Sequence, residues 1–425
     1  MNSKTNDKIN QVTEKTLVIG IDIAKSKHYA CAIDERGRVL QKSFPFSQSN
    51  EGFNLLYQKI SLLLTEHQKS DILVGFEPTG HYWMNLAAFL HLHGIPYVMV
   101  QPNHVNKSKE LDDNLQTKND QKDALVIARL MKDGRFSYPR VLEGVEAELR
   151  NGANLRSKLQ EDLNGIQNRI IRWLDRFFPE FTMVFKIPGK MAFAALEMTP
   201  LPEDIHGKTP EELLFLYRQV EGMKSPQLPK AKKLVSAAEQ SIGLTEGLGM
   251  ARVEIDTLLR QYHLIQSEID KLNEQLNVLA QQLTDYKYLA SVPGVGDSTI
   301  VELLSEVGSL TQYENPRQLI KLAGLTLRES SSGKHKGQKR ISKRGRRKLR
   351  ALLFRVMIPI LSHNTAFKKL HHYYTTRSVN PLKKKQSIVL LCGKLLKVLH
   401  GLIKKQVHFD EQLMMKDLYC LEEAS

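Results

Sequence analysis

One stretch decides how the N-terminal part of this chain folds: Leu17-Val18-Ile19-Gly20-Ile21-Asp22-Ile23, an apolar run with a single carboxylate inside it. A second apolar run, Ile72-Leu73-Val74-Gly75-Phe76-Glu77, ends in another carboxylate. Short apolar runs of this kind are typical of buried strands. A carboxylate buried alone in a strand is costly unless it has a partner, a proton or a metal. The two runs therefore predict strands that carry Asp22 and Glu77 for a chemical purpose.

Outward from these runs, residues 16–135 alternate between strand and helix patterns. The turn Asp34-Glu35-Arg36-Gly37 separates two apolar runs, which favours an antiparallel hairpin. The expected order is strands at 16–24, 28–33 and 39–44, a helix around 53–64, a strand at 72–77, a helix at 81–93, a strand at 97–100, a polar loop at 103–119 and a helix at 121–132. This order predicts an α/β domain with an RNase H-like layout.

Two further carboxylates, Asp120 and Asp123, are three residues apart at the start of the last predicted helix, which places them on one helix face. Such a pair is common by itself, and Asp120 could simply cap the helix. Four carboxylates brought together repel one another unless cations neutralise them. Together with Asp22 and Glu77, the pair predicts a two-metal site in which Mg²⁺ ions activate a nucleophile and stabilise a leaving oxygen.

Residues 145–285 have a different pattern, because apolar side chains recur there every three or four positions. The repeats are Leu155, Leu159, Leu163, Ile166, Ile170, Trp173 and Phe177, and then Leu258, Tyr262, Ile265, Ile269, Leu272, Leu276, Leu279 and Leu283. Sustained spacing predicts a coiled coil, either between the two segments or between subunits. The proline-bearing stretch 182–250 between them is predicted to be a helical insertion. A mostly helical domain is expected at 288–403, followed by a tail at 404–425.

The C-terminal domain contains two candidate phosphate-binding features. Pro293-Gly294-Val295-Gly296 before a helix resembles a helix-hairpin-helix turn, in which Gly294 and Gly296 let backbone N–H groups approach a phosphate. An ordinary helix–helix turn is the alternative. The second feature is a dense run without acidic residues: Lys334, Lys336, Lys339, Arg340, Lys343, Arg344, Arg346, Arg347, Lys348 and Arg350. Charge runs are usually just solvated, but the density of this one favours phosphate contact.

Three serines, Ser330-Ser331-Ser332, and Gly333 immediately precede that basic run. By itself such a sequence indicates a flexible loop. A serine flanked by basic groups could instead attack a phosphodiester, while the cations stabilise the phosphorane.

The composition narrows the class of protein. A chain of 425 residues is expected to form two or three domains. Lys and Arg number 61 against 46 Asp and Glu, and this net charge of +15 suggests a polyanionic partner. Cys31, Cys392 and Cys420 are too few and too scattered for a disulfide framework or a zinc site. The polar N-terminus lacks a signal-peptide core, and the apolar stretch 388–403 is too short and too charged to span a bilayer. The expected setting is the cytoplasm or nucleoid, without a membrane partner.

Taken together, six motifs resemble the insertion-sequence 110 family of transposases. They are Gly20-Ile21-Asp22-Ile23-Ala24-Lys25, Glu77-Pro78-Thr79-Gly80-His81-Tyr82, Lys118-Asn119-Asp120-Gln121-Lys122-Asp123-Ala124, Pro293-Gly294-Val295-Gly296, Ala323-Gly324-Leu325-Thr326 and Arg340-Ile341-Ser342-Lys343-Arg344-Gly345. The resemblance covers most of 16–135 and 288–403. One departure is Asn119, which stands where threonine is usual.

The resemblance implies a RuvC-like DEDD domain, a coiled-coil linker and a C-terminal transposase domain with a catalytic serine. Carried over by motif, the metal-binding acids are Asp22, Glu77, Asp120 and Asp123. The catalytic serine is best matched by Ser332, with Ser331 and Ser330 as alternatives. Members of the family recombine element-end and target DNA. Some use a structured noncoding RNA to specify both DNAs, and they assemble as dimers or tetramers.

The sequence therefore predicts a bacterial or archaeal recombinase that moves an insertion sequence through Mg²⁺-dependent strand cleavage and a phosphoserine link to DNA. Two alternatives remain: a metal-dependent junction nuclease that needs no serine, and a nonenzymatic coiled-coil protein that bridges nucleic acids. A sugar-kinase-like fold also begins with Gly-Ile-Asp, but this chain lacks the glycine-threonine phosphate turn that should follow.

Overall fold

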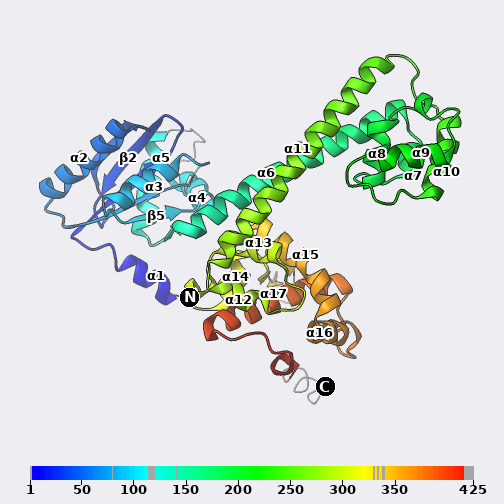
Figure 1. The fold of residues 1–425 in the computed structure, drawn as a ribbon. Coiled ribbons are helices and arrows are strands. Elements are labelled where there is room, and N and C mark those ends of the chain that lie inside the picture. The colour runs from blue at the N-terminus through cyan, green and yellow to red at the C-terminus, as the bar shows by residue number, and fades with distance from the viewer. Residues whose placement is uncertain are drawn as a thin grey trace. The chain divides into compact units, whose positions relative to one another are not determined.

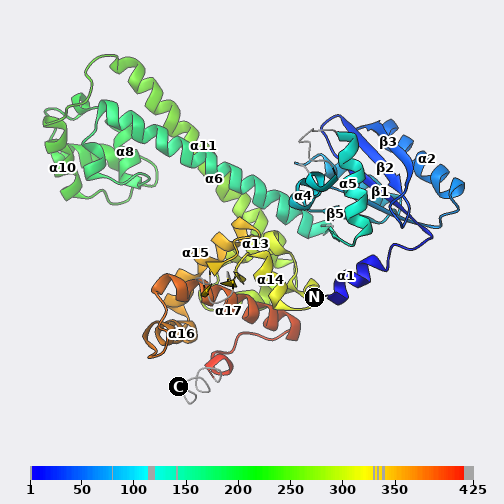
Figure 2. The same ribbon diagram turned by 180° about the vertical axis from the view of Figure 1, so that it is seen from behind.

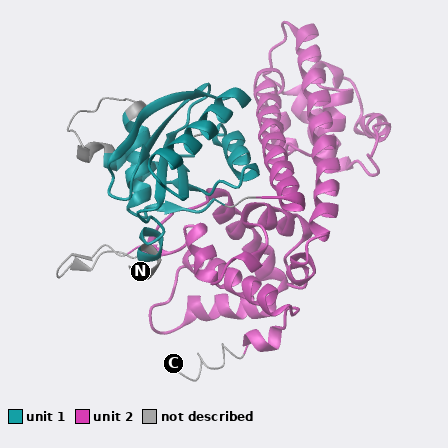
Figure 3. Ribbon diagram, turned by 90° about the vertical axis from the view of Figure 1, so that its left-hand side faces the viewer, with its two compact units in different colours: residues 1–141 teal, residues 142–425 magenta. Residues whose placement is uncertain are grey.

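The computed structural model describes residues 2–78, 80–112, 120–139, 142–328, 331–332, 335–336 and 340–415. The chain divides into two compact units, residues 1–141 and residues 142–425 (Figure 3).

Unit 1 is built on a mixed six-stranded sheet with the order β3-β2-β1-β4-β5-β6. Figure 1 shows this sheet with the helices packed on it. Strands β1, β2 and β3 form an antiparallel meander, β4 and β5 run parallel to β1, and β6 is antiparallel to β5. The strand bounds are β1 Thr16–Asp22, β2 Lys27–Ile33, β3 Val39–Ser47, β4 Asp71–Phe76, β5 Tyr97–Val100 and β6 Phe136–Ser137. The α/β class expected for this part is confirmed.

Helices cover both faces of this sheet, which explains why its central strands are apolar throughout. Alternate residues of β1 enter two separate cores: Leu17, Ile19 and Ile21 contact α2 and α3, whereas Val18 lies on the side of α5. The helices are α1 Asn2–Ile9, α2 Asn50–Glu66, α3 Trp83–Leu92, α4 Pro102–Asp112 and α5 Asp120–Lys132.

The prediction of a polar loop at 103–119 is wrong for its first part, because helix α4 occupies Pro102–Asp112. Proline is favoured at the first position of a helix, where its missing N–H costs nothing. Val105 is fully buried against the sheet in the same core as α5. Besides Pro102, this segment has only Val105 and Leu111 as apolar residues. Two apolar residues are too few to give a helical periodicity, which is why the pattern failed there.

Gly20 allows α5 to lie directly on β1. A Cβ added at Gly20 would sit 2.2 Å from the Ala124 carbonyl oxygen and 2.4 Å from the Ala128 nitrogen, and neither backbone atom can move alone. We expect Gly20→Ala to lower the free energy of unfolding of unit 1 by at least about 2 kcal/mol, measured by thermal or denaturant unfolding. Gly165→Ala, in α6 where a Cβ meets nothing within 4 Å, should instead stabilise by about 0.5 kcal/mol. Equal effects of the two substitutions would contradict this account.

Unit 2 is organised around two helices, α6 Gly144–Phe177 and α11 Leu248–Gln281. Each has 34 residues and is therefore about 51 Å long. They pack as an antiparallel pair, because Leu149 near the start of α6 shares a core with Leu276, and the Trp173 indole donates to the Ala251 carbonyl oxygen at the other end (Figure 1). Of the two pairings left open by the sequence, the structure has the one within a single chain.

The insertion between α6 and α11 forms a small helical cap with its own core (Figure 2). Its helices are α7 Phe181–Val184, α8 Lys190–Met198, η1 Pro202–Asp204, α9 Pro210–Arg218 and α10 Leu228–Glu239. Phe178, Phe181 and Tyr217 are fully buried there, together with Trp173 of α6. The cap therefore closes one end of the helix pair.

The other end of the pair carries a mainly helical domain with a separate core. Its elements are α12 Asp285–Ala290, α13 Asp297–Val307, η2 Leu310–Gln312, α14 Pro316–Leu322, β7 Leu327–Arg328, β8 Ser331–Ser332, β9 His335–Lys336, β10 Arg340–Ile341, α15 Arg347–His363, α16 Thr365–Thr376 and α17 Lys384–Lys405.

Among the described residues, α17 is the one helix long and apolar enough to cross a membrane. Leu391, Leu395 and Leu399 are buried within the C-terminal core, so this helix has the character of a core element.

The segment expected to be a tail begins inside α17, which ends at Lys405. Beyond it, the Phe409 N–H donates to Ser291 Oγ at 2.8 Å, and Met414 is buried. Residues up to 415 therefore belong to the C-terminal core.

Candidate functional site

Asp22 and Glu77 stand at the carboxyl ends of two neighbouring central strands. Asp22 is the last residue of β1, and Glu77 directly follows Phe76, the last residue of β4. The two strands are adjacent and parallel, with Ile21 opposite Phe76. Neighbouring strands are about 4.8 Å apart, so the register places both acidic residues at the carboxyl end of the sheet. Both are half-buried.

Asp123 comes to the same end because of the direction of α5. Ala124 and Ala128 lie over Gly20, and Lys132, the last residue of α5, approaches Gly37 in the turn between β2 and β3. That turn adjoins the start of β1, because Ile33 pairs with Val18. Helix α5 therefore runs antiparallel to β1 and begins towards Asp22. Figure 2 shows α5 beside β1 and β2. Asp123 is buried, and Asp120 begins the helix but has a side chain outside the described part.

These acids suit a hard divalent cation, for which carboxylate oxygens are the preferred ligands. Among the described side chains, no group of three or more His, Cys, Asp or Glu could by itself hold a metal ion. The side chain of Asp120 does not enter that comparison. The structure therefore gathers Asp22, Glu77 and the start of α5 at one end of the sheet, and the metal itself stays a prediction.

The segment that carries the candidate serines has a well-defined base. Strands β7 and β10 pair Leu327 with Ile341 and Arg328 with Arg340. Three backbone bonds continue the contact: Ser342 N–H to the Thr326 oxygen, Lys343 N–H to the Gly324 oxygen and Arg346 N–H to the Leu322 oxygen, at 2.7, 3.1 and 2.7 Å. The two motifs Ala323–Thr326 and Arg340–Gly345, far apart in sequence, thus close the segment between them.

Glycines are required at this base. Gly324 has φ +68°, and a Cβ on Gly345 would lie 2.4 Å from the Leu322 oxygen. The Arg350 guanidinium adds bonds to the Ala323 and Lys343 oxygens at 3.0 and 3.3 Å. Arg350 therefore holds the base together.

Inside this segment, β8 and β9 form a short antiparallel pair, with Ser331 opposite Lys336 and Ser332 opposite His335. Ser330, Lys334 and Lys339 lie outside the described residues, as do the side chains of Ser331, Ser332 and Lys336. The choice among the three serines therefore remains a prediction.

The described part of the basic run divides into two groups. Arg340, Lys343, Arg344, Arg347 and Lys348 are exposed. Arg346 is half-buried; its guanidinium donates to the Glu306 carbonyl oxygen and lies 3.6 Å from the Glu306 carboxylate. The exposed group is therefore the better placed for phosphate.

The glycine turn before α13 has a packing explanation. Gly294 has φ +90°, and a Cβ there would lie 2.7 Å from Ile360 Cα in α15. Gly296 faces open space. The first residue of α13 is Asp297, whose carboxylate accepts a 2.7 Å hydrogen bond from the Tyr286 hydroxyl. Burial, together with this bond, raises the pKa of Tyr286. A carboxylate at this helix N-terminus competes with a phosphate for the same position.

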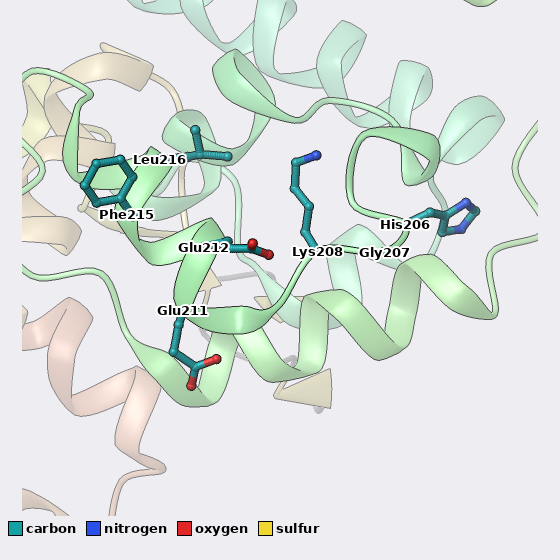
Figure 4. Close-up of a pocket in the computed structure, with 7 residues that line it drawn as sticks. All are labelled: His206, Gly207, Lys208, Glu211, Glu212, Phe215 and Leu216. Carbon is teal, nitrogen blue, oxygen red and sulfur yellow. The ribbon is translucent and has the colours of Figure 1, made fainter.

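A surface hollow on the insertion is lined by residues between His206 and Leu216 (Figure 4). His206 Nε2 donates to the Ala238 oxygen at 3.0 Å, and the Glu212 carboxylate accepts from the Thr209 N–H at 2.7 Å. Both polar groups thus have structural partners.

Sequence reasoning did not single out His28 and Gln48, whose hydrogen bonds link the loops that follow the two acid-bearing strands. A histidine within an apolar strand belongs to no motif, so the sequence offered no signal for them.

Comparison with known proteins finds two matching families. Residues 19–179 match a family of transposases named for the DEDD acids and IS110, and residues 286–372 match the transposase family IS116/IS110/IS902. The transposase for insertion sequence element IS1111A from Coxiella burnetii is 25% identical over 351 residues, covering 81% of this chain and 78% of the relative.

Two other relatives are similar over nearly their whole length. The pilin gene-inverting protein of Moraxella bovis is 23% identical, covering 93% of this chain and 98% of its own. An uncharacterized protein of insertion element IS116 from Streptomyces clavuligerus is 24% identical, with coverage of 91% and 94%. Asp22, Glu77, Asp120 and Asp123 fall in the first matched family, and the serine-bearing segment falls in the second.

Proposed function

This chain belongs to the IS110 family of transposases, and we propose that it moves an insertion sequence by Mg²⁺-dependent cleavage and exchange of DNA strands through a phosphoserine intermediate. The observation that carries the proposal is the convergence of Asp22, Glu77 and the start of α5 at the carboxyl end of the sheet. The order β3-β2-β1-β4-β5 supports an RNase H-like, RuvC-like domain.

In this proposal, Asp22, Glu77, Asp120 and Asp123 hold one or two Mg²⁺ ions. When bound, Mg²⁺ supplies charge neutralisation at the scissile phosphate and stabilises the leaving oxygen. The serine Oγ attacks phosphorus: one Oγ–P bond forms, one P–O ester bond breaks, and the freed DNA hydroxyl takes up a proton. Attack by a second DNA hydroxyl on the phosphoserine then releases the serine. Ser332 is the nucleophile we propose.

The exposed basic residues at the base of the serine segment contact DNA backbone in this proposal. Element-end DNA and target DNA are the partners, and a structured noncoding RNA selects both by base pairing. The net charge of +15 suits these polyanions. We propose a homodimer or tetramer, in which one subunit's acids act beside another's serine. Along the chain, the long helices α6 and α11 separate the acids from the serine segment. This separation supports such a composite site.

The test combines the protein with Mg²⁺, element-junction DNA, target DNA and transcripts of the flanking noncoding region. Products are separated on denaturing gels with and without protease. We expect a protease-sensitive protein–DNA adduct that EDTA prevents. Cleaved DNA without an adduct would favour a junction nuclease. Salt-sensitive binding without any change in the DNA would favour a bridging protein.

The basic segment and the glycine turn make different predictions for DNA binding. Replacing the exposed Arg344 with Gln should weaken binding about tenfold and lower the salt slope by about 1, because one phosphate contact is lost. Gly296→Ala adds a methyl group in open space and should change affinity less than about twofold if no phosphate approaches that backbone. Titrations at several salt concentrations measure both. A larger loss with Gly296→Ala than with Arg344→Gln would assign phosphate to the turn.

A further inference from the structure

A buried histidine and a half-buried glutamine join the loops that follow β1 and β4. His28 belongs to β2, and Gln48 directly follows β3. The Ala24 N–H donates to His28 Nδ1 at 3.2 Å, and His28 Nε2 is hydrogen-bonded to Gln48 Oε1. The Gln48 amide nitrogen then donates to the Tyr82 carbonyl oxygen at 3.0 Å. This chain of bonds runs from the segment after Asp22 to the segment after Glu77.

The donors and acceptors of this bridge are mutually consistent. A backbone N–H can only donate, so His28 Nδ1 must accept and the ring proton must be on Nε2. Gln48 Oε1 therefore accepts, which leaves its amide nitrogen to donate to the Tyr82 oxygen. The ring is fully buried, with Phe46 and Phe53 at centroid distances of 5.0 and 6.3 Å. Burial lowers the pKa of His28, which keeps the ring in the neutral form that the bridge needs.

The strand ladders do not reach these segments. The pairing of β1 with β4 ends at Ile21 and Phe76, one residue before each acid. Beyond that point, the Gln48 N–H donates to the Ser26 oxygen at 3.0 Å, so Gln48 contacts the first loop through its backbone and the second through its side chain. The loops that follow both acid-bearing strands are thus tied to the same residue.

We infer that His28 and Gln48 are positioning residues, which hold the segments after Asp22 and Glu77 in a fixed relation so that the two carboxylates can share a divalent cation. The inference rests on the proposed metal-dependent function. Neither residue needs to touch the cation or the DNA. Groups that hydrogen-bond metal ligands directly commonly contribute about ten- to a hundredfold to metal affinity. His28 and Gln48 act on the segments that follow the ligands, so we expect an effect at the lower end of that range.

Two variants break different hydrogen bonds of the bridge. His28→Phe keeps an aromatic ring between Phe46 and Phe53 but removes both ring nitrogens. Gln48→Glu keeps an acceptor for His28 but places a carboxylate against the Tyr82 carbonyl oxygen. The matched control is His400→Phe, because His400 is also buried and bonds a backbone oxygen, that of Tyr313 at 2.7 Å, in unit 2.

Hydrogen–deuterium exchange of the free, full-length protein tests whether the bridge holds the two segments in place. We expect His28→Phe to speed exchange in peptides covering 22–27 and 80–84. Gln48→Glu should do so mainly in 80–84, and His400→Phe in neither. Unchanged exchange in both peptides with His28→Phe would overturn the inference.

The Mg²⁺ dependence of DNA cleavage measures how much the bridge contributes to metal binding. We expect His28→Phe to raise the Mg²⁺ concentration for half-maximal cleavage about tenfold, while DNA affinity and the rate at saturating Mg²⁺ stay close to wild type. A fall in the saturating rate with unchanged Mg²⁺ dependence would overturn the positioning role. If the wild type shows no Mg²⁺-dependent cleavage, the proposed function fails, and the exchange result alone decides whether the bridge holds the two segments.

Discussion

Replacing Asp22 with Asn is expected to abolish Mg²⁺-dependent strand cleavage and to leave DNA binding nearly unchanged. The amide has the size of the carboxylate but lacks the charge that attracts a cation. Metal-stabilised charge in a phosphoryl transition state is worth several kcal/mol, so the rate should fall about a thousandfold or more. Asp22 ends β1, next to Glu77 and at the end of the sheet where α5 begins. Single-turnover cleavage at saturating DNA, with a binding titration alongside, measures both quantities.

The matched control for this substitution is Asp133→Asn. Asp133 follows the opposite end of α5, is exposed and pairs with Lys132, so its replacement should leave the rate within about twofold. Cleavage by the Asp22→Asn variant at a rate close to wild type would remove the metal role from the acidic set. Loss of DNA binding in that variant would instead indicate a damaged fold.

The position of Glu77 could be predicted from a strand end, because the apolar run 72–76 stops directly before it and the structure ends β4 at Phe76. Asp22 was predicted inside its strand, whereas the structure ends β1 at this residue. The strand was expected to continue to Ala24, but the pairing of β1 with β2 ends at Asp22 and Tyr29. The parallel pairing that makes the two acids neighbours depends on contacts across the whole sheet, which no local pattern records.

The helix pairing, the role of Gly294 and the bridge of His28 and Gln48 depend on tertiary contacts, which leave little pattern in the sequence. The repeats in α6 and α11 fit a seam within one chain or between chains equally well, because both bury the same side chains. Gly294 fits a phosphate-binding turn by pattern, yet its positive φ and its close approach to Ile360 explain the glycine through packing. His28 and Gln48 could not have been found at all, since their bridge joins four segments by single hydrogen bonds.

Replacing Ser332 with Ala should eliminate the covalent protein–DNA adduct while DNA binding persists. Without the Oγ nucleophile the Oγ–P bond cannot form, so the adduct should fall below detection rather than merely slow down. Alanine retains the backbone groups that pair β8 with β9, and its missing hydroxyl changes the local volume little. The measurement is the protease-sensitive band on denaturing gels, run for the wild type and for each serine variant under the same conditions.

The neighbouring serines provide the sharpest controls. Ser331→Ala and Ser330→Ala remove the same atom from adjacent positions, so loss of the adduct in one of the three variants alone identifies the nucleophile. Ser342→Ala removes a hydroxyl that lies 3.2 Å from Thr326 Oγ1 at the base of the segment, and it controls for loosening of that base. If all three variants, Ser330→Ala, Ser331→Ala and Ser332→Ala, retain the adduct, none of these serines is the nucleophile. If the wild type itself cuts DNA without an adduct, metal-dependent hydrolysis at Asp22, Glu77 and α5 accounts for the cleavage without any serine.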